Sequence, residues 1–279
     1  MMKKAIVLGT FDGLHKGHLK VLDSCKESDI KTVLTFDYAP KYANKNYNNI
    51  MQPEIKNNIL KKLGFKVEVL DFFKVKNLSK EEFLDIILQK FSPTQICCGY
   101  NYKFGKNALG DTNFIKEYLK NKVEIAITEE VIYNDQSVSS TLIRNLIKNG
   151  EIKKANELLY KHFCFKAVVL NGDKRGRTIG FPTINQKYPS VLVTPRFGVY
   201  LSSVFINNKK YKAITNIGVR PTFKTDDILA ETHILDFEAD LYGQEITVEL
   251  LDFIRDEVRF NNINELKKAI NKDIEKAFK

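Results

Sequence analysis

The apolar pattern of this 279-residue chain changes once, near residue 160, and this change indicates two joined architectures. Before it, short β-branched runs alternate with stretches of helical period, which predicts a parallel sheet covered by helices on both faces. Right-handed crossovers then place ligand-binding loops at the carboxyl ends of the strands. The predicted strands are residues 4–9, 31–36, 66–72, 94–99 and 123–128, and the predicted helices are residues 17–28, 53–63, 79–90 and 111–121.

The second half has a different pattern. Two helical stretches between residues 139 and 161, broken at Asn149-Gly150, lead into strands with no helices between them. These strands are residues 163–170, 198–206, 211–217, 229–237 and 245–251, and an amphipathic helix at 263–278 closes the chain. The sequence therefore predicts an α/β, Rossmann-like domain at 1–159 and an antiparallel β-barrel domain with a terminal helix at 160–279.

The composition limits the class of partner. Forty-four Lys and Arg residues against 34 Asp and Glu give a net charge of +10, which suits nucleic acid, a membrane surface or a phosphorylated small molecule. The charges are spread over both halves, so we expect most lysines on solvated faces. No apolar run approaches the roughly 18 to 20 residues of a membrane span. Four cysteines without zinc spacing indicate buried thiols in a reduced, cytoplasmic protein.

The stretch from Gly9 to His18, GTFDGLHKGH, follows the first predicted strand and contains two of the four histidines. His15 and His18 stand three residues apart where a helix begins, which puts both imidazoles on one helical face. The helix amino end offers N–H groups to an anion, and three glycines allow a phosphate to approach closely. A metal site and an ordinary solvated pair are the alternatives, although no Asp, Glu or Cys lies at ligand spacing on that face. The glycines favour a site for a transferring phosphoryl or nucleotidyl group.

This stretch resembles the signature of the nucleotidyltransferase superfamily, and residues 138–144, VSSTLIR, resemble its Ser-Ser-Thr-x-Ile-Arg motif. Read alone, Ser-Ser-Thr would be an ordinary helix N-cap. The resemblance implies attack on the α-phosphorus of a nucleoside triphosphate and release of pyrophosphate, with His15 and His18 steadying the transition state. It also implies a set of nucleotide-binding residues in this site: Gly9, Thr10, Phe11, Asp12, Gly13, Asn101, Ser139, Ser140, Thr141 and Arg144.

One position departs from the family pattern. Family members usually have Thr-Phe-x-Pro-His-Pro after the second strand, and this chain has Ala39 where the histidine is expected. Residues 99–105, by contrast, keep the form Gly-x-Asn-aromatic-x-Phe-Gly, in which Asn101 orients the ligand. Loss of one supporting donor would cost on the order of 3 kcal/mol in the transition state, about a hundredfold in rate.

A second motif spans residues 172–185, GDKRGRTIGFPTIN. A basic, glycine-rich loop suits a polyphosphate, although such loops are often merely exposed. The string resembles the riboflavin kinase signature, and further family motifs follow it in order. The resemblance makes Glu231 the general base for the ribityl hydroxyl, where an exposed strand carboxylate would be the ordinary explanation. It implies ATP contacts from Gly172, Lys174, Gly176, Arg177, Gly180, Thr183 and Asn185, metal ligation by Thr183 and Asn185, and flavin contacts from Arg220, Glu257, Arg259 and Phe260.

Both signatures, in this order over essentially the whole chain, resemble the prokaryotic bifunctional riboflavin kinase/FAD synthetase family. The resemblance implies riboflavin, FMN and ATP as substrates, Mg²⁺ or another divalent cation as cofactor, and a monomer or weak homo-oligomer without nucleic-acid or membrane partners. An efficient kinase with weak or lost adenylyltransferase activity stays open because of Ala39. A basic, non-catalytic nucleic-acid-binding protein is the remote alternative, with residues 41–49 as its only candidate segment.

Overall fold

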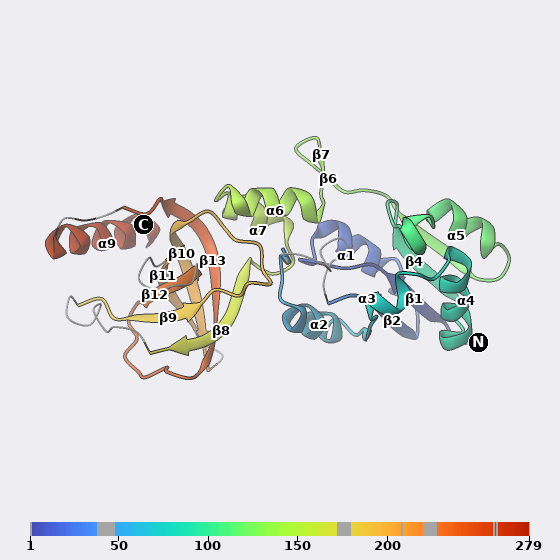
Figure 1. The fold of residues 1–279 in the computed structure, drawn as a ribbon, viewed down its shortest axis with the longest axis horizontal. Coiled ribbons are helices and arrows are strands. Elements are labelled where there is room, and N and C mark those ends of the chain that lie inside the picture. Colours follow the sequence, from blue (N-terminus) through green and yellow to red (C-terminus); the bar gives the residue numbers. More distant parts are fainter. Residues whose placement is uncertain are drawn as a thin grey trace. The chain divides into compact units, whose positions relative to one another are not determined.

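The computed structural model of this chain describes residues 2–37, 48–171, 180–207, 209–219, 228–258, 260 and 262–278 (Figure 1). Its contacts divide the chain into two compact units, Met1–Leu142 with Leu158–Tyr160 and Ile143–Glu157 with Lys161–Lys279. The domain boundary predicted between residues 159 and 160 stays a prediction. Among the described residues, no helix is both long enough and apolar enough to span a bilayer.

The first unit contains a five-stranded parallel sheet in the order β3-β2-β1-β4-β5. Successive residues of a strand enter opposite cores. Val7 and Cys97 pack with helices α1 and α2, whereas Leu8 and Cys98 pack with α4 and α5. The predicted sheet with helices on both faces is thereby confirmed, and all four cysteines are buried free thiols. The bounds are β1 (Lys4–Leu8), β2 (Ile30–Thr35), β3 (Lys66–Val69), β4 (Gln95–Gly99), β5 (Glu124–Thr128), α1 (Lys16–Asp23), α2 (Pro53–Lys62), α4 (Lys80–Phe91) and α5 (Thr112–Tyr118).

Several short elements were not predicted. The third strand ends at Val69 because Asp71 caps helix α3 (Phe72–Val75), its carboxylate accepting the Phe73 N–H at 3.0 Å. A 3₁₀ turn, η2, spans Lys106–Ala108, and α1 ends at Asp23 rather than at residue 28. Strands β6 (Ile132–Tyr133) and β7 (Gln136–Ser137) form a small hairpin whose two turn residues, an Asn-Asp pair, both have positive φ.

The second unit contains a closed antiparallel barrel in the order β10-β11-β12-β9-β8-β13, which confirms the predicted fold class (Figure 1). Helices α6 (Ser140–Lys148) and α7 (Ile152–Leu158) precede it, and they are separated at Gly150, whose φ is +80°. Strand β9 was not predicted, whereas the terminal helix α9 has the predicted bounds. The remaining elements are β8 (Cys164–Leu170), β9 (Thr183–Lys187), β10 (Gly198–Ile206), β11 (Lys209–Val219), β12 (Ile228–Ile234), β13 (Glu245–Arg255) and α9 (Ile263–Phe278).

The barrel interior contains a row of hydroxyls among its apolar side chains. The Ser202 hydroxyl lies 2.7 Å from that of Thr215, which lies 2.9 Å from that of Thr232, and all three residues are fully buried. Because side chains alternate along a strand, Glu231 and His233 of β12 lie on the outer face of the barrel, on either side of the buried Thr232.

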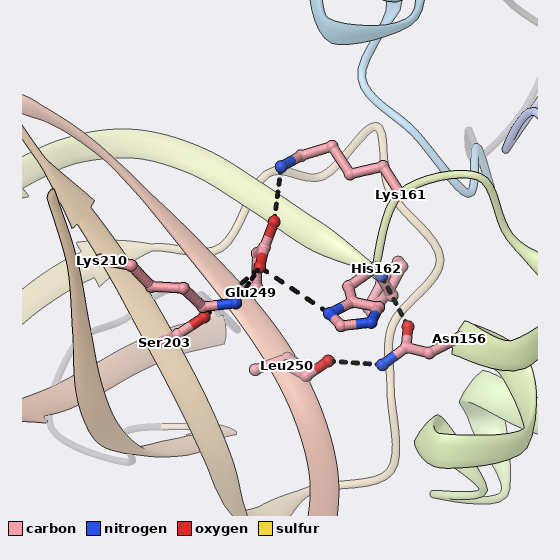
Figure 2. A network of polar contacts seen from close by, with 8 residues as sticks. Asn156, Lys161, His162, Ser203, Lys210, Glu249 and Leu250 are labelled. Carbon is pink, nitrogen blue, oxygen red and sulfur yellow. Dashed lines mark hydrogen bonds and ion pairs between the residues drawn. The ribbon is translucent and has the colours of Figure 1, made fainter. Parts of the chain in front are cut away.

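Glu249 of β13 anchors the chain segment that enters the barrel (Figure 2). Its carboxylate accepts hydrogen bonds from Lys161 at 2.5 Å and from Lys210 at 3.3 Å, and Nδ1 of His162 lies 3.8 Å away. The Asn156 side chain adds a second tie by donating to the Leu250 carbonyl at 2.9 Å and accepting the Phe163 N–H at 2.7 Å. These contacts fix the connection between α7 and β8 on the outside of β13.

Candidate functional site

The two histidines of the first motif lie together at the amino end of α1. His15 is the N-cap residue, and its Nδ1 accepts the His18 N–H at 3.4 Å. The two rings stack with centroids 3.6 Å apart. Because Nδ1 accepts this hydrogen bond, the proton of a neutral His15 lies on Nε2. A Cβ at Gly17 would lie 3.1 Å from the His15 ring, so a larger residue there would crowd the pair.

The loop before these histidines, residues 10–14, which we call the His loop, has an unusual backbone. Phe11 and Leu14 have φ of +52° and +47°, a region that costs a non-glycine residue about 1–2 kcal/mol. Protein donors hold its carbonyls: Phe11 O accepts the Leu14 N–H at 3.2 Å, and Leu14 O accepts the Tyr160 N–H at 3.0 Å. The surrounding fold therefore imposes the shape of this loop.

Asp12 connects the His loop to two distant segments. Its carboxylate, in a residue only 5% exposed, accepts the N–H groups of Ile50 at 2.8 Å and Met51 at 3.3 Å. Its carbonyl accepts the Ser140 hydroxyl at 3.1 Å. The two motifs of the nucleotidyltransferase resemblance, 128 residues apart at this contact, thus lie together. The nucleotide-binding role predicted for Asp12 stays a prediction, and its contacts make it a residue that shapes the loop.

The remaining residues of the predicted nucleotide site lie at the same sheet edge or on α6. Ser139 caps α6 by accepting the Leu142 N–H at 3.2 Å, Thr141 is exposed, and Arg144 is buried on the same helix. Asn101 lies two residues after the end of β4 and is exposed. The strand order changes direction between β1 and β4, and ligands of open α/β sheets bind beside such a switch point, at the carboxyl ends of the strands.

Sequence reasoning missed Lys56, which is buried behind the His loop. Its ammonium donates to Thr10 O at 3.2 Å, to Thr35 Oγ1 at 3.1 Å and to Phe36 O in a shorter contact. Burial lowers the pKa of Lys56 to about 8, and the charges of Asp12 and Asp37 oppose that effect. The only sequence signal was the position of Lys56 in the apolar stripe of α2, one turn before Leu60.

In the barrel, a row of polar side chains crosses three strands. Asn185 on β9 and Asn216 on β11 are the register partners of Glu231 on β12, one on each side. Directly opposed residues of neighbouring strands have Cβ atoms about 4.5–5.5 Å apart. Asn216 in turn donates to Glu257 Oε1 at 3.1 Å. The structure thus brings together three predicted site residues, Asn185, Glu231 and Glu257, and adds Asn216.

His233 holds the predicted ATP-binding segment against the barrel. It pairs with Thr183 in the strand register, and its Nδ1 lies 2.8 Å from Pro182 O. The Phe181 ring meets the imidazole edge-on, with centroids 5.4 Å apart. A pocket beside this segment is lined by Thr183, Ile184, Thr232, Phe237, Leu241 and Tyr242 among others.

The oxygens of this segment fit a divalent cation. Asn185 Oδ1 is buried and has no hydrogen-bond partner within the described part of the chain. Amide and hydroxyl oxygens suit Mg²⁺, which binds proteins through few ligands and completes its shell with water and phosphate. The described residues contain no cluster of three or more His, Cys, Asp or Glu side chains that could hold a metal ion.

Several predicted residues carry no structural test. Seven positions lie outside the described residues: Gly172, Lys174, Gly176, Arg177, Arg220, Arg259 and Ala39.

Two other predicted site residues are described, Gly180 and Phe260. Gly180 has a φ of +85°, which favours glycine. The Phe260 ring lies 5.7 Å from the Arg255 guanidinium, and Arg255 binds the buried Asp273 of α9 at 2.8 Å.

Comparisons with known proteins match both halves of the chain. A family model described as FAD synthetase matches residues 1–142, and one described as riboflavin kinase matches residues 159–279. A bifunctional riboflavin kinase/FMN adenylyltransferase of Bacillus subtilis is 33% identical over 99% of this chain and 92% of its own length. A trifunctional protein RibF/MnmA of Mycoplasmoides gallisepticum is 37% identical over 96% of this chain. This chain spans 38% of the length of that longer relative.

A solved structure agrees in fold. A crystal structure described as a macrolide-efflux protein from Streptococcus pneumoniae has a TM-score of 0.88 and 31% identity, covering 98% of this chain and 93% of its own. The chain joins an FAD synthetase domain and a riboflavin kinase domain, and this combination defines a bifunctional transferase. The chain belongs to the bifunctional riboflavin kinase/FMN adenylyltransferase family, as the two signatures predicted.

Proposed function

We propose that this chain phosphorylates riboflavin to FMN at the barrel, residues 160–279, and adenylylates FMN to FAD at the parallel sheet, residues 1–159. Each reaction consumes one ATP, and the second releases pyrophosphate. The observation that carries the assignment of sites is the alignment of Asn185 and Glu231 on neighbouring strands, beside the segment that holds Thr183. In the parallel-sheet unit, the hydrogen bond from Ser140 to Asp12 joins the two nucleotidyltransferase motifs.

In the kinase reaction, Glu231 accepts the proton of the ribityl hydroxyl as its oxygen attacks the γ-phosphorus of ATP, and ADP leaves. Thr183 and Asn185 are the residues that would hold Mg²⁺, which when bound offsets charge on the phosphates. His233 keeps Pro182 against β12 and so orients the nucleotide-binding segment. Glu257, which accepts a hydrogen bond from Asn216, borders the same row and contacts the flavin in this scheme.

In the adenylyltransferase reaction, a phosphate oxygen of FMN attacks the α-phosphorus of ATP, and pyrophosphate leaves. His15 and His18 donate hydrogen bonds to oxygens whose charge grows in the transition state. The amino ends of α1 and α6 and the guanidinium of Arg144 bind the triphosphate. Asn101, two residues after the end of β4, orients the nucleotide beside the switch point.

The four buried free thiols support a protein that works in a reducing, cytoplasmic compartment. We expect it to act on small molecules as a monomer or weak homo-oligomer, without nucleic acid. The kinase with weak adenylyltransferase activity stays as the second candidate, because Ala39 replaces a histidine of the family pattern.

Two incubations with Mg²⁺ and ATP, one of riboflavin and one of FMN, test the proposal when products are separated by chromatography. Wild-type protein should form FMN and FAD from riboflavin, and FAD from FMN. Glu231→Gln should abolish FMN formation and keep FMN-to-FAD conversion, whereas His15→Ala should have the reverse effect. Each variant thereby contains its own control for folding. Loss of both activities in a folded variant would refute the division of chemistry between the units.

A further inference from the structure

A lysine is buried directly behind the loop that leads to both site histidines. Lys56 is 2% exposed, and its ammonium donates to oxygens of Thr10, Thr35 and Phe36. Thr10 opens the His loop and Thr35 ends β2, so one cation joins the carboxyl ends of two neighbouring strands. A methionine would fill this place in the core without the cost of desolvating a charge. The charge therefore requires an explanation.

We propose that Lys56 is a positioning residue for FMN adenylylation, which holds the His loop through Thr10 and keeps a positive charge at the strand ends where ATP binds. This inference rests on the proposed function of the parallel sheet. Lys56 does not touch the reacting atoms in this scheme. It acts through the loop that leads to His15 and through the field at the site.

The contacts of the neighbouring carboxylates support this role. Asp12, in the His loop, and Asp37, two residues after β2, are the acidic groups whose charges act on Lys56. The Asp12 carboxylate is engaged by the N–H groups of Ile50 and Met51, and Asp37 accepts from Asn57 at 3.2 Å. Within the described ranges, Lys56 donates its hydrogen bonds to oxygens of Thr10, Thr35 and Phe36 rather than to a carboxylate, and the charges of Asp12 and Asp37 favour its ammonium form.

The hydrogen-bond geometry also favours the ammonium over the neutral amine. Three acceptors surround Nζ, and an ammonium has three N–H groups, whereas a neutral amine has two. Carbonyl oxygens facing a triphosphate would repel it, and Lys56 holds two of them, those of Thr10 and Phe36, against itself. Loss of the proton would release one of these contacts and the positive charge together.

This dependence on a proton gives the inference a specific signature. Because the pKa of Lys56 is about 8, FAD formation by the wild type should decline as the pH rises through that value. An arginine at the same position stays protonated over this range, so Lys56→Arg should not show that decline. A purely structural role for Lys56 would not produce such a difference between pH profiles.

The experiment compares full-length wild type, Lys56→Met, Lys56→Arg and the control Lys62→Met, which changes an exposed lysine on the same helix. Both reactions are assayed with Mg²⁺ and ATP from neutral pH to well above 8. Lys56→Met should lose about a hundredfold in kcat/KM for FAD formation, the scale expected when a site is mispositioned. Its riboflavin kinase activity should equal that of wild type, and Lys56→Arg should retain part of the FAD-forming activity.

Wild-type rates of FAD formation in folded Lys56→Met would overturn the inference, as would identical pH profiles of wild type and Lys56→Arg. If Lys56→Met does not fold, the comparison of these two profiles decides the question alone. Equal loss in Lys62→Met would also refute a specific role. A wild type that makes no FAD from FMN would instead overturn the proposed function, and the role of Lys56 with it.

Discussion

Replacement of Glu249 by glutamine should destabilise the barrel by about 2 kcal/mol, because a buried carboxylate loses its charge-assisted hydrogen bonds. The Glu249 side chain is 5% exposed, and its carboxylate oxygens lie 2.5 Å from the Lys161 ammonium and 3.3 Å from the Lys210 ammonium (Figure 2). Breaking a buried ion pair costs about 3–5 kcal/mol when the remaining charge stays buried. Here the two lysine side chains are 29% and 48% exposed, so water replaces part of the lost interaction.

Glu245→Gln is the matched control, since it removes a carboxylate from the same strand. Glu245 pairs with Lys166 at 2.6 Å, but its side chain is 56% exposed, and such surface pairs contribute about 0–1 kcal/mol. The free energy of unfolding is measured by denaturant titration, followed by circular dichroism and by tyrosine fluorescence, since the chain has no tryptophan. Equal losses in the two variants would refute the argument that burial gives Glu249 its importance.

The same comparison has a pH signature. Burial raises the pKa of Glu249, but the hydrogen bond and charge of Lys161 and the charge of Lys210 outweigh it, so the pKa lies below its usual 4.5. A lowered folded-state pKa means that the unfolded chain binds more protons. The stabilisation by Glu249 is therefore present above 4.5 and is lost as the pH falls below that value through the folded-state pKa. Glu249→Gln should lack this part of the acid dependence.

Two further substitutions test individual contacts. Asn185→Ala should raise the Mg²⁺ concentration needed for riboflavin phosphorylation by about tenfold, the lower end of the losses seen when groups that support a metal site are removed. A Mg²⁺ titration of each reaction measures this shift. An unchanged Mg²⁺ dependence of the kinase reaction would show that Asn185 is not part of the metal site. Ser140→Ala removes a neutral hydrogen bond worth about 1 kcal/mol. FAD formation should therefore fall about fivefold, while FMN formation stays constant. A wild-type rate of FAD formation would show that the hydrogen bond from Ser140 to Asp12 does not position the His loop.

Most strands that were predicted from the sequence, such as β1, β2, β4 and β10, have apolar side chains buried on one or both faces, whereas β3 and β5 were predicted although none of their residues is fully buried. Adjacent Cys97 and Cys98 could be placed in a strand because both are apolar in character, and the structure sends them into opposite cores. Strand β9 could not be recognised, because Thr183–Lys187 reads Thr-Ile-Asn-Gln-Lys and contains one aliphatic residue. Its Gln186 side chain is fully buried and donates to the carbonyls of Ala167 and Ile246. Such burial of a polar side chain depends on partners on other strands.

The candidate site divides in the same way. Residues proposed to contact the substrates, such as His15 and Glu231, stand in strings of fixed spacing, because the chemistry requires certain groups at certain separations. Residues that hold them need only reach the right place in the folded chain. His233 and Asp12 stand within the recognised strings, but their supporting roles come from contacts: His233 packs against the Phe-Pro segment, and Asp12 binds N–H groups 38 and 39 residues away. Composition and local pattern carry no record of these long-range contacts.

Lys56 shows what this means for arguments from net charge. In the sequence it is one of 44 basic residues, and most lysines are solvated. An ammonium in the interior is costly unless hydrogen bonds replace its water. Its three oxygen partners come from the ends of β1 and β2, which only the parallel pairing of those strands brings together. The net charge of +10 therefore says less about an anionic substrate than this one lysine, which the fold places at the edge of the sheet where ATP is proposed to bind.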